Sequence, residues 1–166
     1  IWREMRRLAV LGFPIVVALV ATKLIGVVDT IMIAPLGTVP LAAASVTMSV
    51  VMILYSGLYG FVSIIGVRMA EAHGRGSAHG LSLATRSGLI LAAVSGVAGA
   101  ALMLSLRPVL PLIGQPEEVI AALGGYWTAM SLILIPFTLF LTLKGLFDAI
   151  DAPWIGVGLA FLAVAL

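Results

Sequence analysis

The stretch PLAAASVTMSVVMILYSGLYGFVSIIGV, residues 40–67, contains no charged side chain. A helix needs about 20 apolar residues to cross a hydrocarbon core of about 30 Å, and this stretch is longer than that. Its polar residues do not alternate with apolar ones, as they would in a strand of a membrane β-barrel. The stretch therefore predicts a transmembrane α-helix that is tilted or bent.

The whole chain has the composition of a membrane protein, because 62% of its 166 residues are hydrophobic and only 10% are charged. Apolar runs lie at about residues 8–34, 40–67, 81–106, 119–146 and 154–166, and the fifth is truncated by the end of the chain. Pro136 removes a backbone N–H from the fourth run and is expected to bend that helix. The expected fold class is an all-α polytopic membrane protein with about five transmembrane helices.

Basic residues are concentrated in alternate connections between these runs. The connections rich in them hold Arg3, Arg6 and Arg7, then Arg68, Arg75 and Arg86, and finally Lys144. The other two connections hold only Arg107. Cytoplasmic loops carry an excess of Lys and Arg, so we expect a cytoplasmic N-terminus. The expected location is the inner or plasma membrane of the cell. The net charge of +2 is assigned to topology, and no nucleic-acid partner is expected.

The sequence shows no constellation typical of an enzyme. It has no Cys, and His73 and His79 lack the spacing and the nearby acids of a zinc site. Neither a nucleophile-elbow motif nor a Walker motif is present. We therefore expect no enzymatic activity, no catalytic residue and no metal centre other than Na+ at the acidic residue discussed below.

Small residues form a stripe on each of two predicted helices. The members are Ser49, Ser56, Gly60 and Ser63 in the second run, and Gly88, Ala92, Gly96 and Gly99 in the third. Close helix packing is the favoured interpretation of both stripes, because small side chains let membrane helices approach each other. A transport pathway lined by Ser56 and Ser63 is the alternative for the serines.

Asp29 is the charge that stands out in the first run, within GVVDTIMIAPLGT, residues 26–38. A carboxylate facing lipid at full depth costs roughly 2.5 to 3.5 kcal/mol, so Asp29 should face protein or water. An ideal helix places Thr22 and Gly26 on the same face, which makes them candidate cavity-lining residues. Such a carboxylate can exchange a proton or bind Na+. The structural alternative is that Asp29 caps a broken helix or lies in the outer headgroup region.

Lys23 is a second ionisable residue in the first run. It precedes Asp29 by six residues, which is about 9 Å along a helix and roughly 120° around it, so the two are poor partners for a salt bridge. A structural role, with the long side chain reaching the interface, is favoured for Lys23. Contact with a substrate or with an acid elsewhere is the alternative.

The order of several motifs resembles that of the multidrug and toxic compound extrusion family, MATE. These are FPIVV at residues 13–17, VVDTIMIAPLGTVPLAAAS at 27–45, RMAEAHGRGSAHGLSLATRSGL at 68–89, LIGQPEEVIAALGGYW at 112–127, Pro136, and LKGLFDAIDAPW at 143–154. They cover essentially the whole chain and occur in the family's order.

The resemblance implies a twelve-helix antiporter of two six-helix lobes, of which residues 1–166 form most of the first lobe. Such a transporter exports organic, often cationic, drugs or toxins in exchange for Na+ or H+. Asp29 matches the family's aspartate implicated in cation coupling, and Pro14 matches the proline associated with a bend in the first helix. The implied partners are membrane lipid, small organic substrates and the second lobe of the same polypeptide, with no cofactor besides the coupling ion.

We therefore expect a secondary-active antiporter that works by alternating access. One alternative keeps the fold but moves lipid-linked saccharides across the membrane, and Lys23 is the only residue that favours it. Another is a membrane scaffold without transport, in which the small-residue stripes serve only packing.

Overall fold

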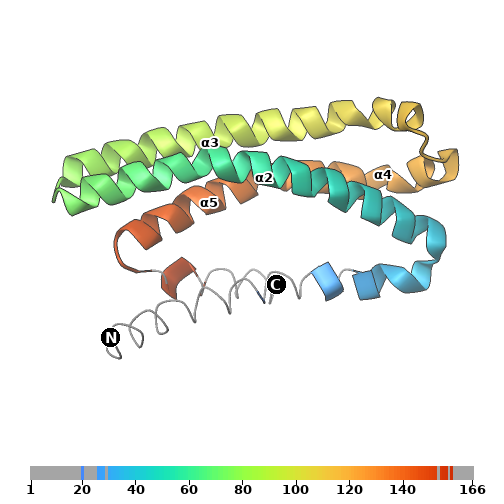
Figure 1. Ribbon diagram of the computed structural model, residues 1–166, viewed down its shortest axis with the longest axis horizontal. Coiled ribbons are helices and arrows are strands. Elements are labelled where there is room, and N and C mark those ends of the chain that lie inside the picture. The colour runs from blue at the N-terminus through green and yellow to red at the C-terminus, as the bar shows by residue number, and fades with distance from the viewer. Residues whose placement is uncertain (1–19, 21–25, 29, 153, 157, 159–166) are drawn as a thin grey trace, which may run out of the picture.

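The computed structural model describes residues 20, 26–28, 30–152, 154–156 and 158, and the regular structure within them is helical. The elements are η1 (Ala34–Leu36), α2 (Thr38–Gly74), α3 (Ala78–Leu106), η2 (Arg107–Ile113), α4 (Glu117–Leu132) and α5 (Leu134–Ala149). Figure 1 shows α2 and α3 as two long neighbouring helices, with α4 and α5 returning alongside them. Helices α2, α3 and α5 all contact one another, and α4 packs against α2 and α3.

Three helical segments among the described residues are long and apolar enough to cross a membrane. They are Thr38–Gly74, Ala78–Ile113 and Glu117–Ala149. The protein is therefore an all-α polytopic membrane protein, as the composition predicted. The expected runs at 8–34 and 154–166 lie mostly outside the described residues.

Helix α2 is longer than the uncharged run of residues 40–67 that predicts it. It continues to Gly74 and measures about 55 Å at 1.5 Å per residue, well beyond the thickness of a hydrocarbon core. The added segment, RMAEAHG, is rich in good helix formers, so the helix persists after the membrane-compatible composition ends. Hydropathy therefore marked the edge of the apolar segment and not the end of the helix.

The turn between α2 and α3 has a defined hydrogen-bonded structure. Gly76 adopts φ +67°, a left-handed conformation that glycine reaches without a Cβ clash. Its N–H donates to the carbonyl of His73 at 2.8 Å, and the N–H of Ser77 donates to the carbonyl of Ala72 at 3.0 Å. The Ser77 hydroxyl then accepts the N–H of Gly80 at 3.0 Å and caps α3. These bonds fix where the two long helices reverse.

The fourth run was expected as one bent helix over residues 119–146. The structure has two helices there, α4 and α5, which together begin at Glu117, end at Ala149 and separate at Ile133. Pro136 has no N–H to donate to the carbonyl of Leu132, the last residue of α4. The break between the two helices lies at Ile133, three residues before the proline, while Pro136 itself lies in the first turn of α5. A second irregularity at Gly124, with φ 28° and ψ −124°, was not expected, because glycines in apolar helices usually remain helical.

The core lies between these helices, and two hydrogen bonds tie α3 to its neighbours. The indole Nε1–H of Trp127, a fully buried side chain of α4, donates to the carbonyl of Met103 at 3.1 Å. The hydroxyl of Thr138 in α5 donates to the carbonyl of Ala92 at 2.8 Å. In lipid such bonds and close packing hold helices together, because apolar surface gains little by moving from lipid to protein.

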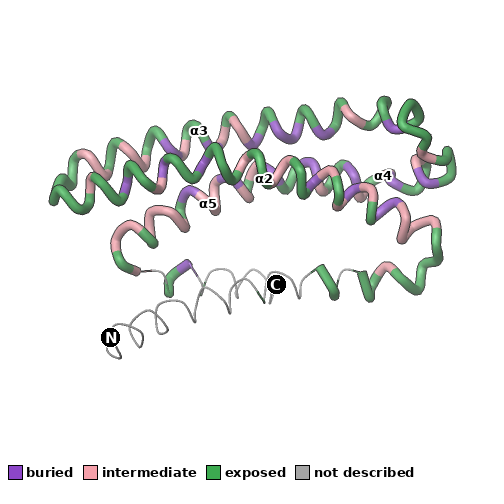
Figure 2. Tube along the Cα trace, viewed as in Figure 1, coloured by how far each residue is buried: buried purple, intermediate pink, exposed green. Residues whose placement is uncertain are grey.

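The small-residue stripe of α3 is a packing surface. Gly88, Ala92, Gly96 and Gly99 are all buried against the neighbouring helices. Figure 2 shows buried positions recurring along α3 between exposed ones. A Cβ added at Gly96 would lie 2.5 Å from Oγ1 of Thr138 and 2.9 Å from Cα of Ile135. Helix α5 therefore approaches α3 as closely as a glycine allows, which is the role favoured for this stripe from the sequence.

Candidate functional site

Helix α2 has two opposite faces with different surroundings. Its packing face includes the buried residues Thr47, Val51, Val62, Ile65 and Met69, spaced so that they recur on one side of the helix. We define the serine face as Ser45, Ser49, Ser56, Gly60 and Ser63. At about 100° per residue, these five positions lie on the side of α2 opposite the packing face. All five are exposed in the described part of the chain.

The serine face and the small-residue stripe of α3 have similar compositions but are packed differently. A Cβ added at Gly60 would meet no atom within 4 Å, whereas one added at Gly96 of α3 would collide with α5. Among the described residues, close helix packing therefore accounts for the stripe of α3 but not for the serine face. Composition alone could not separate the two, because small residues suit both a tight interface and an open surface.

The serine hydroxyls are hydrogen-bonded to their own helix. Ser45 donates to the carbonyl of Leu41 at 2.9 Å, Ser56 to Met52 at 2.9 Å, and Ser63 to Gly60 at 2.8 Å. A hydroxyl that donates its proton in this way still offers oxygen lone pairs outwards. The serine face therefore presents hydrogen-bond acceptors without a formal charge.

A cavity of about 230 Å³ lies at the beginning of the serine face. It is lined by Gly26, Thr30 and Ile33 from the segment before α2, and by Leu41, Ala44, Ser45, Met48 and Met52 from α2. The Thr30 hydroxyl donates to the carbonyl of Gly26 at 2.8 Å, so this wall repeats the pattern of the serines. The cavity is mostly apolar, with two hydroxyl groups and two flexible methionine side chains.

The structure describes three of the site residues predicted from the sequence. Gly26 lines the cavity, while Ser56 and Ser63 lie further along the serine face and do not contribute to its lining. The other four, Pro14, Thr22, Lys23 and Asp29, lie outside the described residues. Their roles as helix bend, cavity lining, intramembrane charge and coupling site remain predictions.

Sequence reasoning missed several residues of this surface. Ser45 precedes Ser49 by four residues, so extending the serine pattern by one turn would have found it. Thr30 lies four residues after Gly26 and shares its face for the same reason. Met48 and Met52 carried no signal, because a methionine on an apolar helix faces lipid, core or cavity with equal ease.

Ion pairs in the described ranges lie near helix ends and outside the cavity at Gly26. Arg75, the C-cap of α2, pairs with Glu71 at 3.4 Å, and Lys144 pairs with Asp148 of the same helix at 2.6 Å; both pairs are exposed. In the same ranges no three His, Asp or Glu side chains come together to hold a metal ion. The chemistry available at the serine face and in the cavity at Gly26 is therefore binding by neutral acceptors and apolar groups.

Comparison with known proteins gives one family and a consistent set of relatives. The family model MatE matches residues 14–166. The chain is 30% identical over 148 residues to a protein from Synechococcus sp., which covers 89% of this chain and 32% of that protein. It is 30% identical over 164 residues to a protein from Deinococcus radiodurans, with 97% and 36% covered. Both relatives are named probable multidrug resistance protein NorM.

A protein of the same name from Pseudomonas aeruginosa is 28% identical over 148 residues, which covers 89% of this chain and 30% of that protein. The chain thus spans about a third of the length of the curated relatives it matches. No solved structure matches it.

Proposed function

The chain belongs to the MatE family, and on this premise we propose that it forms most of the first lobe of a secondary-active multidrug efflux transporter. The protein is integral to a membrane, and its relatives are named for multidrug resistance. The proposed activity is export of organic, mainly cationic, compounds in exchange for Na+ or H+. Export needs no covalent step, so the proposed protein is a transporter and not an enzyme.

The serine face, whose five residues are all exposed in the part of the chain that the structure describes, is the observation that carries this proposal. From Ser45 to Ser63 it extends about 27 Å at 1.5 Å per residue, close to the thickness of a hydrocarbon core. We infer that this face lines a central cavity between the two lobes of the complete transporter. Its hydroxyl oxygens then accept hydrogen bonds from N–H groups of cationic substrates. The side chains of Met48 and Met52 adapt to apolar groups of different shapes.

Ion coupling is assigned to Asp29, the carboxylate predicted in the first run. Protonation or Na+ binding there favours one of two arrangements of the first lobe, and substrate binding favours the other. A ligand shifts such an equilibrium only by its difference in affinity for the two states, so both ligands must contact residues that move. The tight packing of α3 against α5 lets these helices move as one body during alternating access.

Chemical labelling of single cysteines tests whether the serine face lines an aqueous pathway. The chain has no native Cys, so Ser56→Cys and Ser63→Cys in the complete parent protein, with any cysteines beyond residue 166 replaced, add one thiol each. We expect a charged thiol reagent in water to modify both, because only a solvated thiol forms the reactive thiolate readily. A saturating cationic substrate should slow this labelling.

Val97→Cys on α3 is the matched control, because Val97 is exposed on a helix that has no serine face. The proposal assigns this exposed side of α3 to lipid, so its thiol should react at least about tenfold more slowly, the effect of raising the thiol pKa by one unit. Equal labelling of Val97→Cys and Ser56→Cys, or protection of neither serine position by substrate, would show that the serine face does not line the pathway.

A further inference from the structure

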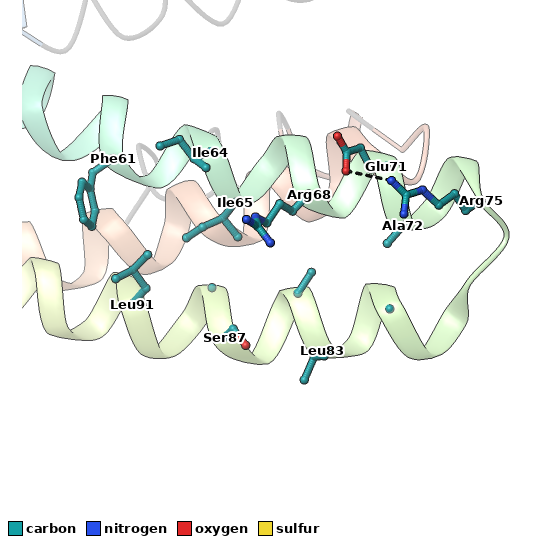
Figure 3. A pocket seen from close by; sticks show the side chains of 13 residues that line it. Phe61, Ile64, Ile65, Arg68, Glu71, Ala72, Arg75, Leu83, Ser87 and Leu91 are labelled. Atoms are coloured by element: carbon teal, nitrogen blue, oxygen red, sulfur yellow. Dashed lines mark hydrogen bonds and ion pairs between the residues drawn. The ribbon is translucent and has the colours of Figure 1, made fainter.

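A second surface lies where α2 and α3 approach their connecting turn, away from the cavity at Gly26. It is a groove of about 490 Å³ between the two helices, open along one side. Figure 3 shows Phe61, Ile64 and Arg68 on the α2 side and Leu91 on the α3 side. We call this surface the interfacial groove.

The interfacial groove changes from apolar to charged along its length. Phe61, Ile64 and Leu91 form its apolar part, whereas Arg68 and Arg75 lie closer to the turn. Arg68 follows Phe61 by seven residues, which is about 10 Å along the helix axis. It is also the first charged residue after the uncharged run of residues 40–67, and we therefore place the border of the hydrocarbon core near it.

The charged end has an excess of positive charge. Arg75 is paired with Glu71 at 3.4 Å, and both side chains are exposed. Arg68 has no hydrogen bond or ion pair with any residue that the structure describes, and Figure 3 shows its guanidinium between the two helices. A guanidinium at the edge of the hydrocarbon core is favoured there only when an anion or water solvates it.

We propose that the interfacial groove binds one anionic phospholipid. An acyl chain lies against Phe61, Ile64 and Leu91, and the phosphate accepts hydrogen bonds from Arg68. Along the membrane normal, the groove is first apolar and then cationic. A phospholipid has its acyl chains and its phosphate in the same order. Guanidinium forms paired hydrogen bonds with phosphate oxygens, which gives Arg68 a partner that it lacks within the described chain.

Native mass spectrometry of the complete parent protein, titrated with dioleoyl phosphatidylglycerol and in parallel with dioleoyl phosphatidylcholine, tests this proposal. We expect tighter binding of phosphatidylglycerol by the wild-type protein. Arg68→Gln should weaken that binding about fivefold, the usual contribution of one basic residue near an anionic lipid surface. Ser87→Phe should also weaken this binding, because Ser87 is an exposed residue that lines the groove and the larger side chain would fill space that the lipid occupies. This substitution does not change the charge of the groove.

Arg86→Gln is the matched control for charge, since Arg86 is an exposed arginine of α3 at the same end and does not line the groove. It should leave the affinity for phosphatidylglycerol unchanged. Equal losses of affinity for phosphatidylglycerol in Arg68→Gln and Arg86→Gln would show that the lipid is attracted only by the overall positive charge. That result would overturn the proposal. Equal affinity for the two lipids, or full binding by Ser87→Phe, would overturn it as well. If another part of the parent chain covers the groove, Ser87→Phe destabilises the protein and the lipid preference is unchanged, which also contradicts the proposal.

Discussion

Replacing Asp29 with asparagine in the complete parent protein is expected to reduce gradient-driven export to the level of passive leak while the protein still folds. Asparagine has nearly the same shape as aspartate but neither exchanges a proton nor offers a negative charge to Na+. A charged carboxylate facing lipid at full depth costs roughly 2.5 to 3.5 kcal/mol, so removing the charge should not lower stability. The expected loss is therefore one of coupling and not of fold.

Accumulation of a fluorescent lipophilic cation in cells that express each variant measures this export. Asp148→Asn is the matched control, because Asp148 is an exposed acid paired with Lys144 at 2.6 Å. Exposed pairs of this kind contribute less than about 1 kcal/mol, so this variant should keep both its stability and its export. Export by Asp29→Asn at the wild-type level would remove Asp29 from the coupling mechanism and return it to a structural role.

Gly96→Val should destabilise the first lobe more than any other single change considered for the described residues. Even the first added carbon would lie 2.5 Å from Oγ1 of Thr138 and 2.9 Å from Cα of Ile135. The second of these is a backbone atom, so α5 must move away from α3 and the bond from Thr138 to Ala92 is lost. Overpacking typically costs about 1–3 kcal/mol, and we expect the upper end here because a backbone atom is displaced, while the gain in helix propensity is under about 1 kcal/mol.

The free energy of unfolding of the complete protein, measured by titration with a denaturing detergent, tests the effect of Gly96→Val. Gly57→Val is the control with the same chemical change, because a Cβ at Gly57 meets no atom within 4 Å. Gly57→Val should change the free energy of unfolding by less than about 1 kcal/mol, because no atom is displaced and valine and glycine differ in helix propensity by less than that. Equal stability of the wild type and Gly96→Val would show that α3 and α5 are not held together at this glycine.

The sequence predicts the helices well because lipid imposes a simple rule on them. A spanning segment must be apolar and must satisfy its own backbone, so the run of residues 40–67 leads directly to α2. The rule says nothing about where a helix ends in water, which is why α2 extends to Gly74. The rule also does not predict the backbone angles of Gly124, for which the described structure shows no close contact as a cause.

The candidate site could be predicted only in part. The spacing of Ser56 and Ser63 predicts that they share one face of the helix. It does not predict whether that face is packed or exposed, because this depends on which helices cover it. The glycines of α3 show the opposite outcome from a similar pattern, as the contacts of Gly96 demonstrate. Asp29 was singled out first for its chemistry, since a charge in an apolar run is costly wherever its neighbours lie, and then by its match to the family's aspartate.

The central claim, that this lobe belongs to an ion-coupled exporter, is tested most directly by uptake of a lipophilic cationic dye into inverted vesicles. The vesicles contain the complete parent protein, wild type or Asp29→Asn, and the Na+ and pH gradients are imposed separately. We predict that one gradient drives uptake by the wild type and that Asp29→Asn loses this uptake, which would identify the coupling ion. Uptake that is the same with and without either gradient, or no uptake by the wild type, would contradict the claim.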